Sequence, residues 1–119
     1  MSDEVTDDDD AEQLEANRQT VAQLVGHGDV LTKPRPVDHW LYFATAAERD
    51  RFLGEVVPLG FDVADKHGDA RPPRPFCARV CRVDRVDLES IHRAVMTLFA
   101  AAKRNAGEYD GWECPVERE

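Results

Sequence analysis

From residue 37 onward, the hydrophobic pattern switches repeatedly between the two-residue period of a β-strand and the 3.6-residue period of a helix. Residues 37–43 alternate and are rich in aromatic and β-branched side chains, which predicts a strand. Thr45 and Glu48 follow in the spacing of a helix-capping box. The same criteria predict the remaining elements in this order: a helix that buries Phe52, Leu53, Val56 and Val57, a strand at 61–64, a strand at 76–83, a helix capped by Asp87 and a strand at 109–114.

The order strand–helix–strand–strand–helix–strand restricts the fold to few topologies. Because crossover connections are right-handed, each strand–helix–strand unit leaves room for one strand of the other unit. The sequence therefore predicts an α+β, ferredoxin-like βαββαβ sandwich with a four-stranded antiparallel sheet. Its first and third strands are central, both crossover helices cover one face, and residues 65–75 form a mobile loop.

An additional helix precedes this unit. Leu14, Val21, Leu24 and Val25 fall on one helical stripe, which predicts a helix over residues 11–25. Residues 1–10 lack hydrophobic anchors, so we expect them to be a disordered acidic lead before a single domain spanning residues 11–116. The aspartates of this lead favour a role in capping and solubilising the helix, with a binding tail as the alternative.

The net charge of −9 is concentrated at the N-terminus. Residues 1–15 contain eight acidic residues and no basic residue, so the rest of the chain is nearly neutral. This balance argues against binding nucleic acid through bulk positive charge. Its apolar stretches are too short to predict a membrane span, and the start lacks a secretory pattern. With 119 residues and three cysteines, an odd number, we expect one cytoplasmic domain without a disulfide framework.

The sequence shows no pattern of catalysis or of cofactor binding. Cys77 and Cys81 share a strand face about 13 Å apart by strand rise, too far to hold one zinc ion, and we interpret them as packing residues. The histidines have no metal-ligand spacing, and His39 on the apolar face of the first strand is interpreted as a core residue. No glycine-rich phosphate loop follows a strand. We therefore expect no enzyme activity, no cofactor and no metal.

Aromatic residues gather on two strands that the topology makes neighbours: Trp40 and Tyr42 on the first, Tyr109 and Trp112 on the last. Alternation places at least one of each pair on the face away from the helices. They form either a small second core beneath the N-terminal helix or a surface that binds a partner, since Trp and Tyr dominate interface energetics. An RNA-recognition sheet would need aromatic residues on the third strand, which offers only Phe76.

Two segments are similar to one known family. The segment L-T-K-P-R-P-V-D-H-W-L-Y-F at residues 31–43 resembles the L-x-K-P-R-x-V-D-H-x-x-Y-F motif of the regulator of ribonuclease E activity B (RraB) family. The segment E-Y-D-G-W-E at residues 108–113 resembles that family's closing strand, and residues 60–63 fit its turn into the second strand. The resemblance extends over about residues 11–116.

This resemblance implies a cytoplasmic, ferredoxin-like protein without catalysis of its own that binds ribonuclease E, lowers its activity on RNA and alters which transcripts it cuts. It implies a partner that is ribonuclease E or a degradosome component, with no direct contact to nucleic acid or membrane. Family members can carry a long acidic C-terminal tail, whereas here the acidic run lies at the other end. The residues carried over from the motifs are Asp38, His39, Tyr42, Phe43, Tyr109, Asp110, Gly111 and Trp112.

Two functional hypotheses follow. In the first, the aromatic residues anchor a basic segment of a nuclease and the acidic charge speeds association. Its candidate partner-binding residues are Asp38, His39, Trp40, Tyr42, Tyr109, Asp110 and Trp112. In the second, the chain is a ferredoxin-like dimer that binds a small molecule between its sheets. The sequence leaves the binding face and the oligomeric state open.

Overall fold

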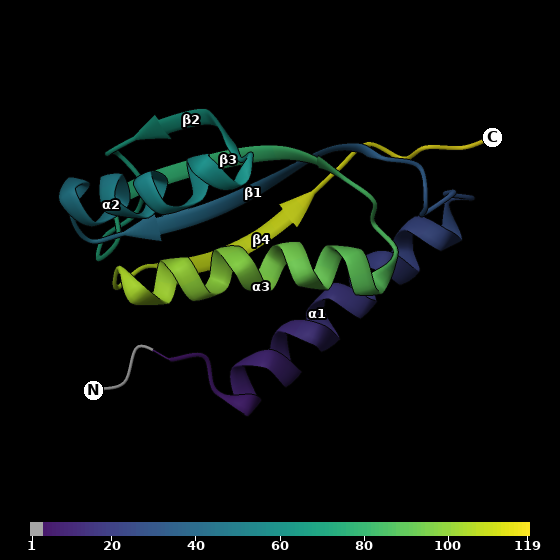
Figure 1. Cartoon of the computed structure of the whole chain (residues 1–119), viewed down its shortest axis with the longest axis horizontal. Helices are drawn as coiled ribbons and strands as arrows, with labels where there is room; N and C mark the ends of the chain where they lie inside the picture. The colour runs from purple at the N-terminus through teal and green to yellow at the C-terminus, as the bar shows by residue number, and fades with distance from the viewer. Residues whose placement is uncertain (1–3) are drawn as a thin grey trace.

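A computed structural model describes residues 4–119, so residues 1–3 of the expected acidic lead lie outside the described residues. Its elements alternate as the periodicity predicts (Figure 1). In chain order they are α1 (Asp7–Gly26), β1 (Arg35–Phe43), α2 (Ala46–Val56), the 3₁₀ turn η1 (Val57–Leu59), β2 (Asp62–His67), β3 (Phe76–Asp84), α3 (Leu88–Arg104) and β4 (Glu108–Glu113).

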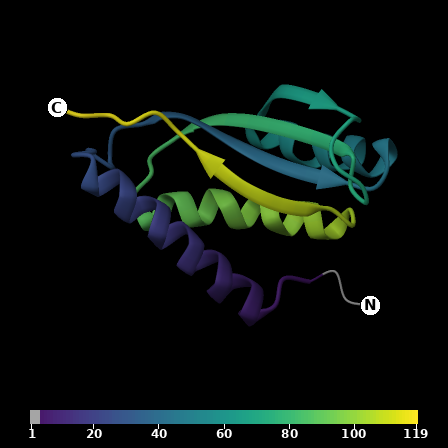
Figure 2. The same ribbon diagram turned by 180° about the vertical axis from the view of Figure 1, so that it is seen from behind.

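The four strands form one antiparallel sheet in the order β2-β3-β1-β4. The first and third strands are therefore central, and the predicted ferredoxin-like α+β arrangement is confirmed. Helices α2 and α3 lie on one face of this sheet. Seen from behind in Figure 2, the strands lie in front of these two helices, and α1 runs beside α3 instead of crossing the sheet.

The core lies between the sheet and the two crossover helices. Leu41 and Phe43 of β1 and Phe52 of α2 are fully buried there, and the Phe43 and Phe52 rings lie 5.2 Å apart between centroids. Helix α3 contributes Ile91 and Leu98, as its sequence stripe predicts. Gly107, just before β4, is needed for a close approach, because a Cβ there would lie 2.2 Å from the Phe43 ring.

Helix α1 begins at Asp7, four residues before the expected start, so residues 7–10 are helical and not disordered. Thr6 caps the helix: its hydroxyl accepts a hydrogen bond from the Asp9 amide, and the Asp9 carboxylate accepts one from the Thr6 amide, each 3.0 Å long. Aspartates at a helix N-terminus also stabilise the helix, because their negative charge lies at the positive end of its dipole. The expected start of the helix at residue 11 was wrong because it relied on hydrophobic side chains, whereas α1 begins at a polar cap.

Strand β2 is longer than its hydrophobic pattern predicted. It continues from residue 64 to His67, and residues 65–67 pair with β3 across a bulge, although a loop was expected from residue 65. All but the last of its residues are exposed. The backbone ladder alone extends such an edge strand, and a ladder leaves no mark on side-chain periodicity.

Candidate functional site

The residues of β1 divide between the two faces of the sheet. Val37, His39 and Leu41 are fully buried beneath the helices, whereas Trp40 and Tyr42 point the other way and are half-buried. This division agrees with the predicted alternation. We call the surface of the sheet away from α2 and α3 the open face; it is defined by Asp38, Trp40, Tyr42, Asp62, Asp65, Cys77, Arg79, Cys81, Asp110 and Glu113.

His39 and Tyr109 meet in the core. The His39 Nδ1 atom lies 2.8 Å from the Tyr109 hydroxyl oxygen, at hydrogen-bond distance. Burial lowers the pKa of His39 from 6.5 to about 3 and raises the pKa of Tyr109 well above its usual value, so both side chains are neutral at physiological pH. The interpretation of His39 as a core residue is therefore confirmed. The structure places His39 fully inside the fold, and Tyr109 is 9% exposed, so neither side chain belongs to the open face.

Strand β4 contains a bulge that changes which way its aromatic residues point. Tyr109 pairs with Leu41 and Trp112 pairs with His39, with the register shifting between Trp40 and Leu41. Both β4 aromatic residues therefore lie on the side of the helices. The expectation that one of them faces away is wrong, because the extra residue of a bulge inverts the alternation beyond it.

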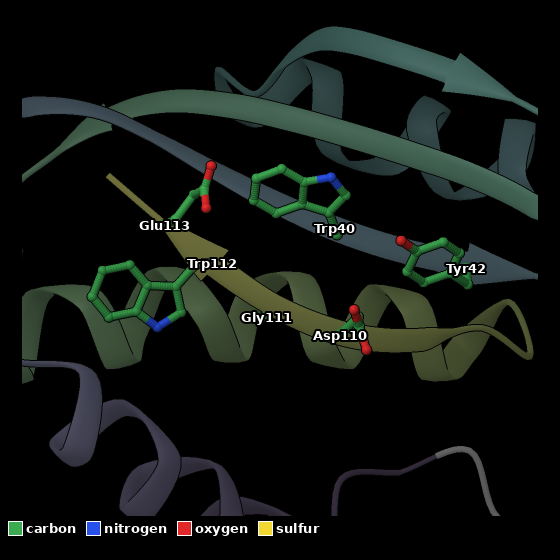
Figure 3. A pocket seen from close by; sticks show the side chains of 6 residues that line it. All are labelled: Trp40, Tyr42, Asp110, Gly111, Trp112 and Glu113. Atoms are coloured by element: carbon green, nitrogen blue, oxygen red, sulfur yellow. The ribbon is translucent and has the colours of Figure 1, made fainter. Parts of the chain in front are cut away.

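Trp112 points toward α1, as Figure 3 shows. Its indole N–H donates a 3.0 Å hydrogen bond to the Asn17 side-chain oxygen, which also accepts one from Gln13. The amide nitrogen of Asn17 therefore donates to His92 Nδ1 at 3.0 Å, and His92 Nε2 faces an Asp10 carboxylate oxygen at 2.9 Å. Trp112 thus belongs to the contact between α1 and the domain, so for this residue the second-core alternative applies.

The open face keeps Trp40, Tyr42 and Asp110 from the predicted set at one location. Together with Gly111, Trp112 and Glu113 they line a shallow hollow of about 310 Å³ (Figure 3). Gly111 lies opposite Trp40 in the neighbouring strand, so no side chain from that position fills the space beside the indole. A φ of +140° at Gly111 also favours glycine there.

Carboxylates surround these two aromatic residues. Asp38 lies two residues from Trp40 on β1, and Glu113 lies opposite Asp38 on β4. At the opposite edge of the sheet, but on the same open face, β2 presents Asp62 opposite Cys81 and Asp65 opposite Arg79. Arg79 lies with its guanidinium carbon 5.9 Å from the centre of the Trp40 ring. Among the residues that define the open face, five are acidic and Arg79 is basic, and Arg71 and Arg74 border this face beside Tyr42.

The cysteines carry no sign of nucleophilic chemistry. Cys77 and Cys81 both lie on the open face of β3, and burial raises the pKa of each thiol, which keeps it protonated. All three cysteines are free. Within residues 4–119, no group of three or more His, Cys, Asp or Glu side chains could hold a metal ion.

Two structurally important residues were not singled out from the sequence. Asn17 is fully buried, and its signal was a polar residue on the stripe between Leu14 and Val21. Arg35 is also buried; it pairs with Asp29 at 2.5 Å and donates to the backbone carbonyls of Lys33, Val30 and Pro115. Arg35 therefore connects the linker before β1 to the C-terminal segment, and its charge stabilises the fold.

The geometry defines a ferredoxin-like α+β domain whose helices cover one sheet face and whose other face exposes aromatic residues among carboxylates. A family model described as regulator of ribonuclease activity B matches residues 14–114. The chain therefore belongs to this family of regulators of ribonuclease activity. Among curated proteins, none matches the chain.

No helix within residues 4–119 is both long and apolar enough to cross a bilayer.

Proposed function

We propose that this protein is a non-catalytic regulator that acts in the cytoplasm by binding ribonuclease E or another component of the RNA-degrading assembly. Binding changes how the nuclease acts on RNA. The observation that carries the proposal is the open face, where Trp40 and Tyr42 lie exposed in part between carboxylates in a chain of this regulatory family. Aromatic anchors within a charged rim are the usual composition of a protein-binding surface.

The open face fits a protein partner better than RNA. Phe76, the aromatic residue of β3, pairs with Phe43 and therefore lies on the helix side of the sheet. The open face of β3 carries Cys77, Arg79 and Cys81 in its place. Bases of single-stranded RNA need aromatic platforms and a positive surrounding, and carboxylates repel the phosphate backbone.

The proposal is tested by affinity capture with the full chain from its own host, at low and at high salt. The wild type is expected to recover ribonuclease E or a component of its assembly, and to lower the rate at which the recovered nuclease cleaves an RNA substrate. The double variant Trp40→Ala/Tyr42→Ala should lose at least tenfold in capture while keeping its circular dichroism spectrum. Higher salt should weaken capture, because charge contributes to association.

The matched control is Val25→Ala/Leu59→Ala, which removes two exposed apolar side chains away from the open face. This variant should capture the nuclease as the wild type does. Trp112 is not used here, because its removal also disturbs α1. Failure of the wild type to recover any nuclease contradicts the proposal, as does a stable dimer in light scattering whose melting temperature rises only with a metabolite.

A further inference from the structure

We propose that the open face binds an extended basic segment of the protein partner, with the guanidinium of one arginine seated in the hollow beside Trp40. This inference rests on the proposed function and adds the binding face and the chemistry of the partner. Three features of the described residues carry it: the free side of an indole, two carboxylates beside it, and the distribution of charge across the sheet.

The two sides of Trp40 differ. On the β3 side, Arg79 already places its guanidinium near the indole, with 5.9 Å between its central carbon and the ring centre. On the β4 side, the residue opposite Trp40 is Gly111, and even an added Cβ there would meet nothing within 4 Å. The indole therefore borders open space on this side, where a second planar cation would lie near the ring as Arg79 does on the β3 side.

Asp110 and Glu113 line the same hollow. Neither carboxylate takes part in any ion pair among residues 4–119, whereas acids elsewhere, such as Asp29, Glu55 and Asp9, are paired. An arginine fits these surroundings better than a lysine, because its planar guanidinium stacks on an indole and donates two parallel hydrogen bonds to a carboxylate.

The charge of the open face extends beyond the hollow. Asp38 of β1 lies opposite Glu113 and adds a carboxylate beside the hollow, and Asp62 and Asp65 lie at the opposite edge of this face on β2. An extended segment that crosses from β4 toward β2 would meet carboxylates along its path, which favours several positive residues in that segment. Two copies of this face would instead set carboxylates against carboxylates, so charge complementarity selects a basic partner over a second copy.

The N-terminal aspartates are a weaker candidate for the same role. Asp9 pairs with Lys103 at 2.6 Å and Asp10 contacts His92 at 2.9 Å, so both help to fasten α1 to α3. The hydrogen bond from Lys103 lowers the pKa of Asp9, which stabilises its charged form. Part of the acidic run is therefore occupied within the fold, while Asp110 and Glu113 have no such partner.

The test uses the full chain and three synthetic peptides of one length: an arginine–serine–glycine peptide, the same peptide with lysine for arginine, and the same peptide with citrulline, which is neutral and nearly isosteric. Affinity is measured by calorimetry at low salt. The location is measured by NMR, because Trp40 and Trp112 give two indole N–H signals. We expect the arginine peptide to bind at least threefold more tightly than the lysine peptide, the citrulline peptide not to bind, and the Trp40 indole signal to move more than the Trp112 signal.

Variants separate a specific face from general attraction between charges. Asp110→Lys/Glu113→Lys should weaken the arginine peptide at least tenfold. The control Glu12→Lys/Glu119→Lys makes the same change in net charge at exposed positions on α1 and at the C-terminus, and should weaken it less than threefold. Equal losses in both variants overturn the inference, as does an unmoved Trp40 signal or tighter binding of an RNA oligonucleotide than of the peptide.

The same variants distinguish this inference from the proposed function. If the wild type and Asp110→Lys/Glu113→Lys capture the nuclease equally well, the function stands and the assignment of the binding face fails. If the peptide behaves as expected and the wild type captures no nuclease, the face binds basic segments but the proposed regulation of a nuclease fails.

Discussion

The two faces of the sheet are built from alternate residues of the same strands, yet they serve different ends. On the covered face, His39, Leu41 and Tyr109 are buried, and His39 Nδ1 lies at hydrogen-bond distance from the Tyr109 hydroxyl oxygen. On the open face, Trp40 and Asp110 are their immediate sequence neighbours and lie at the edge of a shallow hollow. Adjacent residues of one family motif thus divide between maintaining the fold and contacting the surroundings, so a motif match alone does not tell the two roles apart.

The largest expected difference between the faces is in stability. Leu41→Ala removes a fully buried side chain from the centre of the core and should lower the free energy of unfolding by about 2–5 kcal/mol. Trp40→Ala, one residue earlier, should cost about 1 kcal/mol or less, because the indole is partly exposed and loses mainly its contact with Arg79. Urea unfolding of both variants measures the difference. Similar costs would show that the open face is packed against something in solution.

The second prediction concerns how the free energy of unfolding depends on pH through His39. Because burial holds its pKa near 3 in the fold, the unfolded chain takes up a proton near pH 6.5 that the folded chain does not. The unfolded state therefore binds more protons between these two values, and stability falls as pH decreases. The loss is about 1.4 kcal/mol per pH unit, or about 2 kcal/mol between pH 7 and pH 5.

Urea midpoints across this pH range measure the slope, which should flatten in His39→Phe. The matched control is His27→Phe at an exposed position after α1, which should keep the wild-type slope. NMR titration of the His39 ring in the wild type provides a second measurement that does not depend on a variant folding. A ring that titrates near pH 6.5 in the folded protein would place His39 in contact with solvent.

The smallest expected effect distinguishes the two tryptophans. Trp112→Phe keeps an aromatic ring but removes the N–H that donates to Asn17, and should cost about 1–2 kcal/mol because that oxygen is buried. Hydrogen exchange should show the loss first in α1, while the central strands β1 and β3 keep their protection. Trp40→Phe should leave exchange in α1 unchanged. Equal effects of the two variants would mean that α1 is not fastened through Trp112.

Much of the fold could be predicted from particular residues. The alternation of residues 37–43, the cap at Thr45 and the stripe of α3 fixed the element types, and the handedness of crossovers then fixed the strand order. What could not be predicted was any feature that depends on backbone pairing: the continuation of β2 to His67 and the bulge at which Trp112 changes sides. Hydrogen-bond register is a property of two strands together, so neither strand's side-chain pattern contains it.

The candidate site was predicted in part for the same reason. Trp40, Tyr42 and Asp110 could be selected from their residue types and strand positions, and they do lie together on the open face. Arg79 and Glu113 were not selected, because their role depends on which strands become neighbours of β1. The predicted strand order could have found them, because it already makes the strands that contain Arg79 and Glu113 the neighbours of β1.

By itself, the sequence determined which segments become helices and strands, which face of β1 is apolar, and that His39 belongs to the core, since each follows from local periodicity and the cost of exposing apolar surface. Only the tertiary structure decided that Asp9 and Asp10 meet Lys103 and His92 of α3, that Trp112 contacts α1, and that Trp40 lies beside a hollow with unpaired carboxylates. These outcomes depend on contacts between residues far apart in the chain, and such contacts exist only once the sheet has paired.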